Sequence, residues 1–130
     1  MKEKLKYHHI GIPTDIPRED EEYLEEFKMY GSGYEKSPYG VEWMWFEPDS
    51  PLPELVKTVA HVAFVVDDLQ TAIDGKEILI EPNSPVEGVK VAFIVDNGAP
   101  IEFLQFEKPE SEVWWIYRRG TKVRHCEHRS

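Results

Sequence analysis

An internal repeat limits the possible folds of this sequence more than any other pattern in it. HIGIPTD at residues 9–15 aligns with HVAFVVD at residues 61–67, an offset of 52. Farther along, VEWMWFE at residues 41–47 aligns with IEFLQFE at residues 101–107. Each copy therefore has a segment that opens with histidine and a later segment that contains glutamate. The repeat predicts two copies of one structural unit, and the units should pair because neither could bury a sheet alone.

Local patterns predict the secondary structure of each copy. Runs rich in β-branched and aromatic residues predict strands, and apolar side chains at helical spacing after Arg18 predict a helix. The Asn97-Gly98 pair between two apolar runs predicts a tight β-hairpin. We expect strands at residues 5–12, 41–47, 59–66, 77–81, 89–95 and 100–106, and helices at residues 18–30 and 68–74. These elements predict an α+β fold of two paired βαβββ modules, at about residues 5–50 and 58–107.

Length and composition narrow the classes of protein. The 130 residues suit one domain, which we place at residues 1–107, followed by a partly flexible C-terminal extension at residues 108–130. The net charge of −10 argues against nucleic acid as a partner. No apolar run approaches the ~20 residues of a membrane helix, and the single cysteine, Cys126, fits a reducing compartment. We expect a cytoplasmic protein that binds neither nucleic acid nor membrane. The role of the basic tail within residues 108–130 stays open.

Strand parity predicts where the repeated polar side chains point. Side chains alternate between the two faces of a strand, so His9 and His61 should point away from the face that packs on a helix. By the same parity, Glu42 and Glu102 should point into the surface that the histidines share. The apolar residues predicted to line a pocket there are Tyr7, Met44, Phe46, Leu104 and Phe106.

Two imidazoles and two carboxylates form a suitable ligand set for a divalent metal. They suit Zn²⁺, Ni²⁺, Fe²⁺ or Mn²⁺ and balance its charge. Without a metal, two inward carboxylates on an apolar sheet would suffer desolvation and mutual repulsion. Any one of these residues could instead be an ordinary histidine or a solvated glutamate, but their repetition favours a metal site. His8 is out of phase with His9, so we expect it to point toward the packed face.

The segments HHIGIPTD, HVAFVVDDL and GAPIEFLQF resemble the vicinal oxygen chelate superfamily, which includes glyoxalase I, methylmalonyl-CoA epimerase, extradiol dioxygenases and bleomycin resistance proteins. The resemblance covers roughly residues 5–107. It implies paired βαβββ modules whose strands form a curled mixed sheet around a metal. The first module would be shortened, because only residues 31–40 separate its expected helix from its glutamate strand. The positions that match the family's metal ligands are His9, Glu42, His61 and Glu102.

The resemblance implies a metal-dependent lyase or isomerase of the glyoxalase or epimerase type. Such an enzyme would act on a small oxygenated metabolite by metal-assisted proton transfer, with Glu102 or Glu42 as general base. We expect this protein to form a homodimer. An Fe²⁺ dioxygenase of the extradiol type, which needs only two histidines and one carboxylate, is one alternative. A metal-free protein that binds a small molecule, like the bleomycin resistance proteins, is the other.

Overall fold

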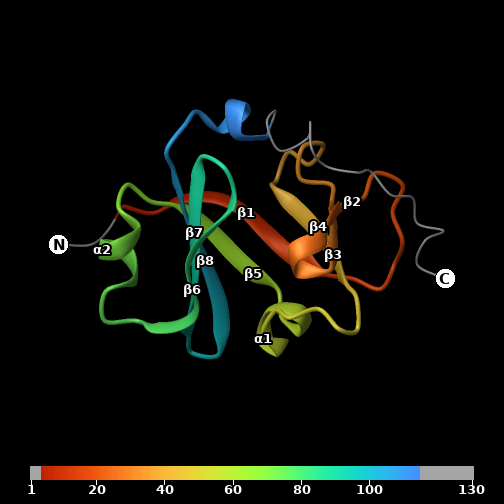
Figure 1. Ribbon diagram of the computed structural model, residues 1–130, viewed down its shortest axis with the longest axis horizontal. Helices are drawn as coiled ribbons and strands as arrows, with labels where there is room; N and C mark the ends of the chain where they lie inside the picture. The colour runs from red at the N-terminus through yellow and green to blue at the C-terminus, as the bar shows by residue number, and fades with distance from the viewer. Residues whose placement is uncertain (1–3, 115–130) are drawn as a thin grey trace.

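The computed structural model describes residues 4–114, and within them eight strands form a single curled, mixed sheet (Figure 1). The fold is therefore α+β, as predicted, with little helix. The elements in chain order are β1 (Lys6–Pro13), β2 (Glu22–Leu24), the 3₁₀ helix η1 (Glu25–Phe27), β3 (Met29–Ser32), β4 (Val41–Phe46), α1 (Glu54–Thr58), β5 (His61–Val65), α2 (Leu69–Ile73), β6 (Glu77–Val86), β7 (Val89–Asp96) and β8 (Ala99–Phe106).

The sheet has the same strand arrangement on both sides of its centre. Its order is β2-β3-β4-β1-β5-β8-β7-β6. The central strands β1 and β5 run antiparallel, and each pairs in parallel with the last strand of its own half, β4 or β8. The remaining neighbours are antiparallel. The two halves thus join within one chain, and the strands that carry the repeated histidines lie side by side at the centre.

Several local predictions are confirmed. Strands lie at all six predicted places, although β6 continues to Val86, and α2 lies within the predicted helix at residues 68–74. Asn97 and Gly98 have φ values of 50° and 82°. Two positive φ values in succession are what a two-residue turn between twisted antiparallel strands requires, so the β7–β8 hairpin follows from its sequence. The short helix α1 lies between β4 and β5, where no helix was predicted.

The helix predicted at residues 18–30 is wrong. The segment forms the hairpin of β2 and β3 instead, with η1 between them. Tyr23 and Tyr30 are register partners across this hairpin, and their ring centroids lie 4.8 Å apart. Lys28, at φ 48°, reverses the chain after η1. The apolar spacing fits a helix, but cross-strand pairing and burial against the sheet override that local preference.

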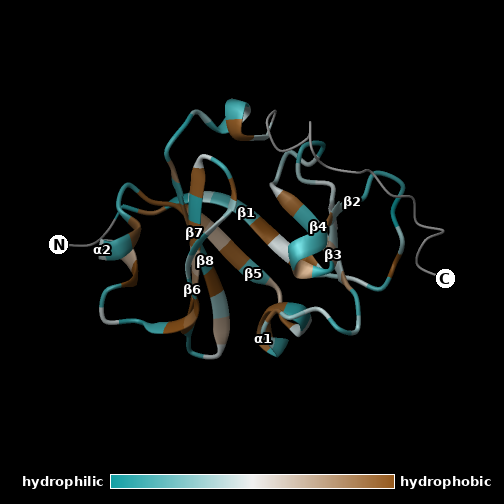
Figure 2. Ribbon diagram, in the orientation of Figure 1, coloured by the Kyte–Doolittle hydropathy of each residue, from teal (hydrophilic) through white to brown (hydrophobic). Residues whose placement is uncertain are grey.

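The prediction that the first module is shortened therefore needs a correction. We expected one strand to be missing between the first helix and β4. The first half has all four strands, and the described chain has no α-helix between β1 and β2. In the second half, α2 occupies the corresponding place between β5 and β6. Figure 2 shows hydrophobic residues gathered on the central strands, whereas the loop from β1 to β2 is largely hydrophilic.

Two hydrophobic clusters lie on opposite faces of the second half of the sheet. The cluster under α2 contains Val66, Leu69, Ala72, Ile73, Ala92, Ile94 and Phe103. The other cluster contains Ala63, Val86, Val89, Val91, Leu104 and Val113. Because β8 alternates between these faces, Phe103 packs with α2 while Glu102 and Leu104 face the other side. Among the described residues no helix has the length and apolar character needed to cross a membrane.

Candidate metal centre

Strand register brings the repeated residues together around small side chains. Gly11 on β1 lies in register with Glu42 on β4 and with His61 on β5. A Cβ atom at Gly11 would lie 2.3 Å from Cε1 of His61. The His61 ring therefore lies directly over the backbone of β1, in space that any larger residue would fill.

The second repeat makes the reciprocal arrangement. Ala63 on β5 lies in register with His9 on β1 and with Glu102 on β8. Gly11 and Ala63 each follow their own histidine by two residues, so they stand at equivalent positions of the repeat. A small residue thus lies beside one histidine and one glutamate in each half. This crossed register gathers the four polar side chains at the junction of the two halves.

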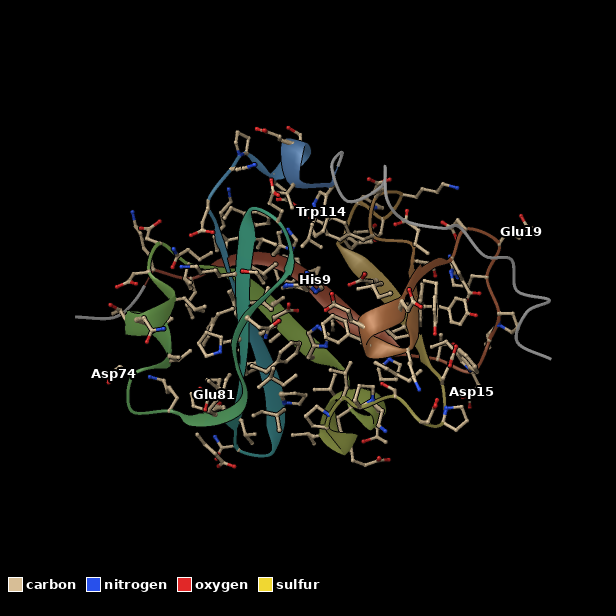
Figure 3. The ribbon with its side chains drawn as sticks, in the orientation of Figure 1. His9, Asp15, Glu19, Asp74, Glu81 and Trp114 are labelled. Atoms are coloured by element: carbon tan, nitrogen blue, oxygen red, sulfur yellow. The ribbon has the colours of Figure 1, made fainter. Side chains whose placement is uncertain are left out.

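Three of the four side chains converge on one point. Nε2 of His61 lies 3.0 Å from Oε1 of Glu102, and Nε2 of His9 lies 3.2 Å from the same oxygen. One ligand atom from each residue lies within 4.8 Å of the others, and all three residues are buried. Figure 3 places His9 at the centre of the molecule. His9, His61 and Glu102 therefore form a buried group that can hold a metal ion.

Glu42 lies at the margin of this group. Its Oε1 is 3.6 Å from Nε2 of His9, and 31% of its side chain is exposed, against 12% for Glu102. Gly31 on β3 leaves space for the Glu42 carboxylate, because a Cβ at Gly31 would lie 3.0 Å from its Oε2. Glu42 faces the same centre as the other three residues but is held less tightly.

The electrostatics of the group favour a positive charge at its centre. Burial alone would raise the pKa of the Glu102 carboxyl, but hydrogen bonds from His61 and His9 hold that pKa far below its usual range. Burial lowers the pKa of His9, yet the hydrogen bond and charge of Glu102, together with Glu42, raise it overall. A buried carboxylate that faces two imidazoles is satisfied by protons or by a cation. The donor set, two imidazole nitrogens and a carboxylate oxygen, fits a transition metal.

A cavity of about 320 Å³ opens beside this group. Its walls come from both halves and include His9, Glu42, His61 and Glu102 as well as the predicted pocket residues Met44 and Leu104. Phe46, at the end of β4, is not among its lining residues, and neither is Phe106, which packs between His8 and Trp114. The group therefore lies in the wall of an accessible, largely apolar chamber.

Tyr7 and His8 lie on the faces opposite to those predicted. Register runs from Tyr7 opposite Phe64 to His9 opposite Ala63, so β1 has one extra residue at this point, a β-bulge. A bulge interrupts the alternation of side chains. His8 lines the same cavity as His9, whereas Tyr7 is 48% exposed and donates a hydrogen bond to the carbonyl of Tyr39. The prediction that His8 points to the packed face is wrong for this reason.

Three residues that the sequence analysis missed surround His8. Oε2 of Glu110 lies 2.6 Å from Nε2 of His8, 3.1 Å from the hydroxyl of Tyr34 and 2.8 Å from Nε1 of Trp114. Burial would raise the pKa of Glu110, but the hydrogen bonds from His8 and Trp114 lower it to about 2. Glu110 and Trp114 belong to the extension expected at residues 108–130, of which residues 115–130 lie outside the described part. No signal in the sequence links positions so far apart.

Comparisons with known proteins bear on the fold alone. No family model matches the sequence, and a search of curated proteins finds no match. Among solved structures, the chain is similar to the crystal structure of a hypothetical protein from Bacillus halodurans C-125, with a TM-score of 0.63 and 18% identity. The match covers 82% of this chain and 97% of that one. At this identity the likeness supports the arrangement of the strands and carries no information on chemistry.

Proposed function

We propose that this chain is a metal-dependent enzyme of the glyoxalase or epimerase type, a lyase or isomerase of the vicinal oxygen chelate superfamily. The observation that carries the proposal is the convergence of His9, His61 and Glu102 in the wall of an apolar cavity. Burying polar groups destabilises the folded protein unless they are paired or bind an ion. Packing alone does not explain why both halves of the chain bury them at equivalent positions.

The sheet topology supports the same proposal. Two halves with equal strand order, joined through β1 and β5, agree with the paired modules that the family resemblance implies. We assign the modules to residues 5–50 and 58–107. In the first module the helix is replaced by an extended loop. The loop begins directly after β1, and β1 still pairs in parallel with β4, so the strands of the site are intact.

Each site residue has a distinct role in the proposed enzyme. His9 and His61 hold the metal through Nε2, and Glu102 holds it through a carboxylate oxygen. A bound Zn²⁺, Ni²⁺, Fe²⁺ or Mn²⁺ would polarise a substrate carbonyl and stabilise negative charge on neighbouring oxygens. Glu42 is the better general base of the two carboxylates, because it lines the cavity and is more exposed than Glu102. It takes a proton from the carbon next to the carbonyl and returns it to the same or the adjacent carbon.

The cavity favours an uncharged substrate. Its volume suits a small molecule. Its lining includes the acidic residues Asp20, Glu22 and Glu35 but, among the described residues, a single lysine. That lysine, Lys36, lies 3.9 Å from a carboxylate oxygen of Asp20. Negative charge on the walls disfavours substrates that carry phosphate or carboxylate groups. We therefore propose a hydroxycarbonyl compound with an apolar tail and no anionic group.

Proton exchange with heavy water tests this function without knowledge of the full reaction. We expect the metal-loaded protein to catalyse deuterium incorporation next to the carbonyl of uncharged α-hydroxyketones, followed by NMR, and to exchange their phosphorylated analogues far more slowly. Glu42→Gln should slow exchange by about 10²–10⁴-fold, because it removes the base. Glu77→Gln, which makes the same change of charge at an exposed residue outside the cavity lining, is the control and should keep the rate. Failure of the wild-type protein to exchange any compound of this class would contradict the proposal.

Two other functions have some support from specific observations. Glu42 lies outside the group of three ligands, and a site of two histidines and one carboxylate leaves positions for oxygen, as in an Fe²⁺ dioxygenase. Oxygen consumption with Fe²⁺ and a catechol would support that alternative. The largely apolar cavity would also suit a metal-free binding protein. That alternative predicts tight binding of a flat apolar ligand by protein stripped of metal.

A further inference from the structure

A chain of hydrogen-bonding groups leads from His9 away from the proposed metal position. Nδ1 of His9 lies 2.7 Å from Nδ1 of His8. Nε2 of His8 lies 2.6 Å from Oε2 of Glu110, which comes from the segment after β8. Glu110 is thus connected to the far side of the His9 ring through His8, and the β-bulge in β1 is what allows both rings to lie on one side of the sheet.

The chemistry of Glu110 determines the direction of these hydrogen bonds. A carboxylate can only accept, and within the described residues its Oε2 meets His8, Tyr34 and Trp114. Trp114 Nε1 can only donate. Oε2 is therefore an ionised acceptor, consistent with the pKa of about 2, and Nε2 of His8 carries the proton that it donates. Tyr34 stacks on His8 with ring centroids 5.0 Å apart, which fixes the ring in this position.

The position of the proton on His8 then determines which nitrogen donates in the hydrogen bond between His8 and His9. A neutral imidazole with a proton on Nε2 has a lone pair on Nδ1, so Nδ1 of His8 accepts. Nδ1 of His9, at 2.7 Å, must donate. When a metal displaces the proton that Nε2 shares with Glu102, a His9 with its other proton on Nδ1 offers the lone pair of Nε2, the atom that faces Glu102 and Glu42. This is the tautomer in which Nε2 can bind a metal.

His61 has no equivalent support. Its Nδ1 is buried and has no hydrogen-bond partner among residues 4–114. Its ring is held by packing instead, over Gly11 and against the ring of Phe93, whose centroid is 5.0 Å away. The two histidines that the repeat makes equivalent in sequence are therefore held by different means, and of the two only His9 has a hydrogen-bond partner at Nδ1 among the described residues.

We propose that Glu110 and His8 are positioning residues that hold His9 in the tautomer with a free Nε2, ready to bind the metal. This role rests on the proposed function, since it prepares His9 as a ligand. It assigns a purpose to a second histidine and to a carboxylate outside the repeat. Neither residue needs to touch the metal or the substrate.

Glu110, His8 and His9 form a hydrogen-bond relay, and the zinc affinity of matched variants tests it. Glu110→Gln replaces an obligate acceptor by a group that can donate to His8 Nε2 and reverse the chain, which would place the His9 proton on Nε2. We expect Zn²⁺ binding, measured by competition with a chromophoric chelator, to weaken by about 10–100-fold. Glu112→Gln, two residues farther along and exposed, is the control and should bind like wild type. Glu110→Asp keeps the acceptor and should recover part of the loss.

The NMR spectrum of the histidine rings gives a second readout that does not depend on metal. Long-range ¹H–¹⁵N correlation of ¹⁵N-histidine protein should show a proton on Nδ1 of His9 in wild type at pH 8 and the loss of that proton in Glu110→Gln. Wild-type zinc affinity in Glu110→Gln, or the absence of a proton on Nδ1 of His9 in wild type, would overturn the relay and leave the metal site standing. Wild-type protein that binds no zinc would instead refute the proposed function, while the ring spectrum would still test the relay.

Discussion

Glu102→Gln is expected to lose metal binding almost completely while the protein stays folded. Nε2 of His9 and Nε2 of His61 both lie within 3.2 Å of Oε1 of Glu102. Groups that only support a ligand typically contribute ~10–100-fold to metal affinity, so loss of a ligand's charge should cost more than that. Metal content by mass spectrometry after gel filtration, together with zinc titration, measures the effect.

The fold of this variant should survive, which separates loss of a ligand from loss of structure. A glutamine amide oxygen still accepts a hydrogen bond from either imidazole, so the stability of the metal-free protein should fall by only about 1–2 kcal/mol. Glu107→Gln is the matched control, because it makes the same change of charge at an exposed residue directly after the same strand, β8. Retention of stoichiometric, tightly bound metal in Glu102→Gln would mean that the ion lies elsewhere.

Gly11→Ala is expected to damage both the site and the stability of the fold. The added methyl group would lie 2.3 Å from Cε1 of His61 and 2.8 Å from both of its ring nitrogens. His61 is only 3% exposed and its ring also packs against Phe93, so a clash of this size displaces the ring from its position. Overpacking of this kind costs about 1–3 kcal/mol, and a displaced ring can no longer direct Nε2 toward Glu102. Urea unfolding and zinc titration measure the two effects.

Gly31→Ala is a milder substitution with which Gly11→Ala can be compared. Its methyl group would lie 3.0 Å from Oε2 of Glu42, the far end of a flexible and partly exposed side chain. The carboxylate can move, so stability should change little and zinc binding should persist through the other three ligands. Equal stability and zinc affinity in Gly11→Ala and wild type would contradict the described position of His61.

The sequence predicted correctly those features of the structure that depend on neighbouring residues in the chain. The repeat placed His9, His61 and Glu102 on strands of known parity, and parity alone directed them to one face. The Asn97-Gly98 turn also needed no tertiary information. The segment at residues 18–30 did, because its apolar spacing suits a helix and a buried hairpin equally, and the edge of the sheet determined the outcome.

The residues around the site could not be predicted from the sequence, for a different reason. The bulge at His8 arises from the pairing of β1 with β5, and nothing in the local sequence marks it. One inserted residue moved Tyr7 out of the predicted pocket and brought His8 into the cavity. Glu110 lies 102 residues from His8 and outside the repeat, so only the folded chain reveals their contact.

X-ray absorption at the metal edge, on protein purified without chelators, tests the metal centre most directly. We predict about one ion per chain, with two imidazole nitrogens at ~2.0–2.1 Å and carboxylate oxygen at ~2.0–2.2 Å if the metal is zinc. The imidazole signal should fall to one ring in His9→Ala and in His61→Ala if either variant still holds the ion. A chain that carries far less than one ion, or an ion coordinated by sulfur or by oxygen alone, would contradict the metal centre formed by His9, His61 and Glu102.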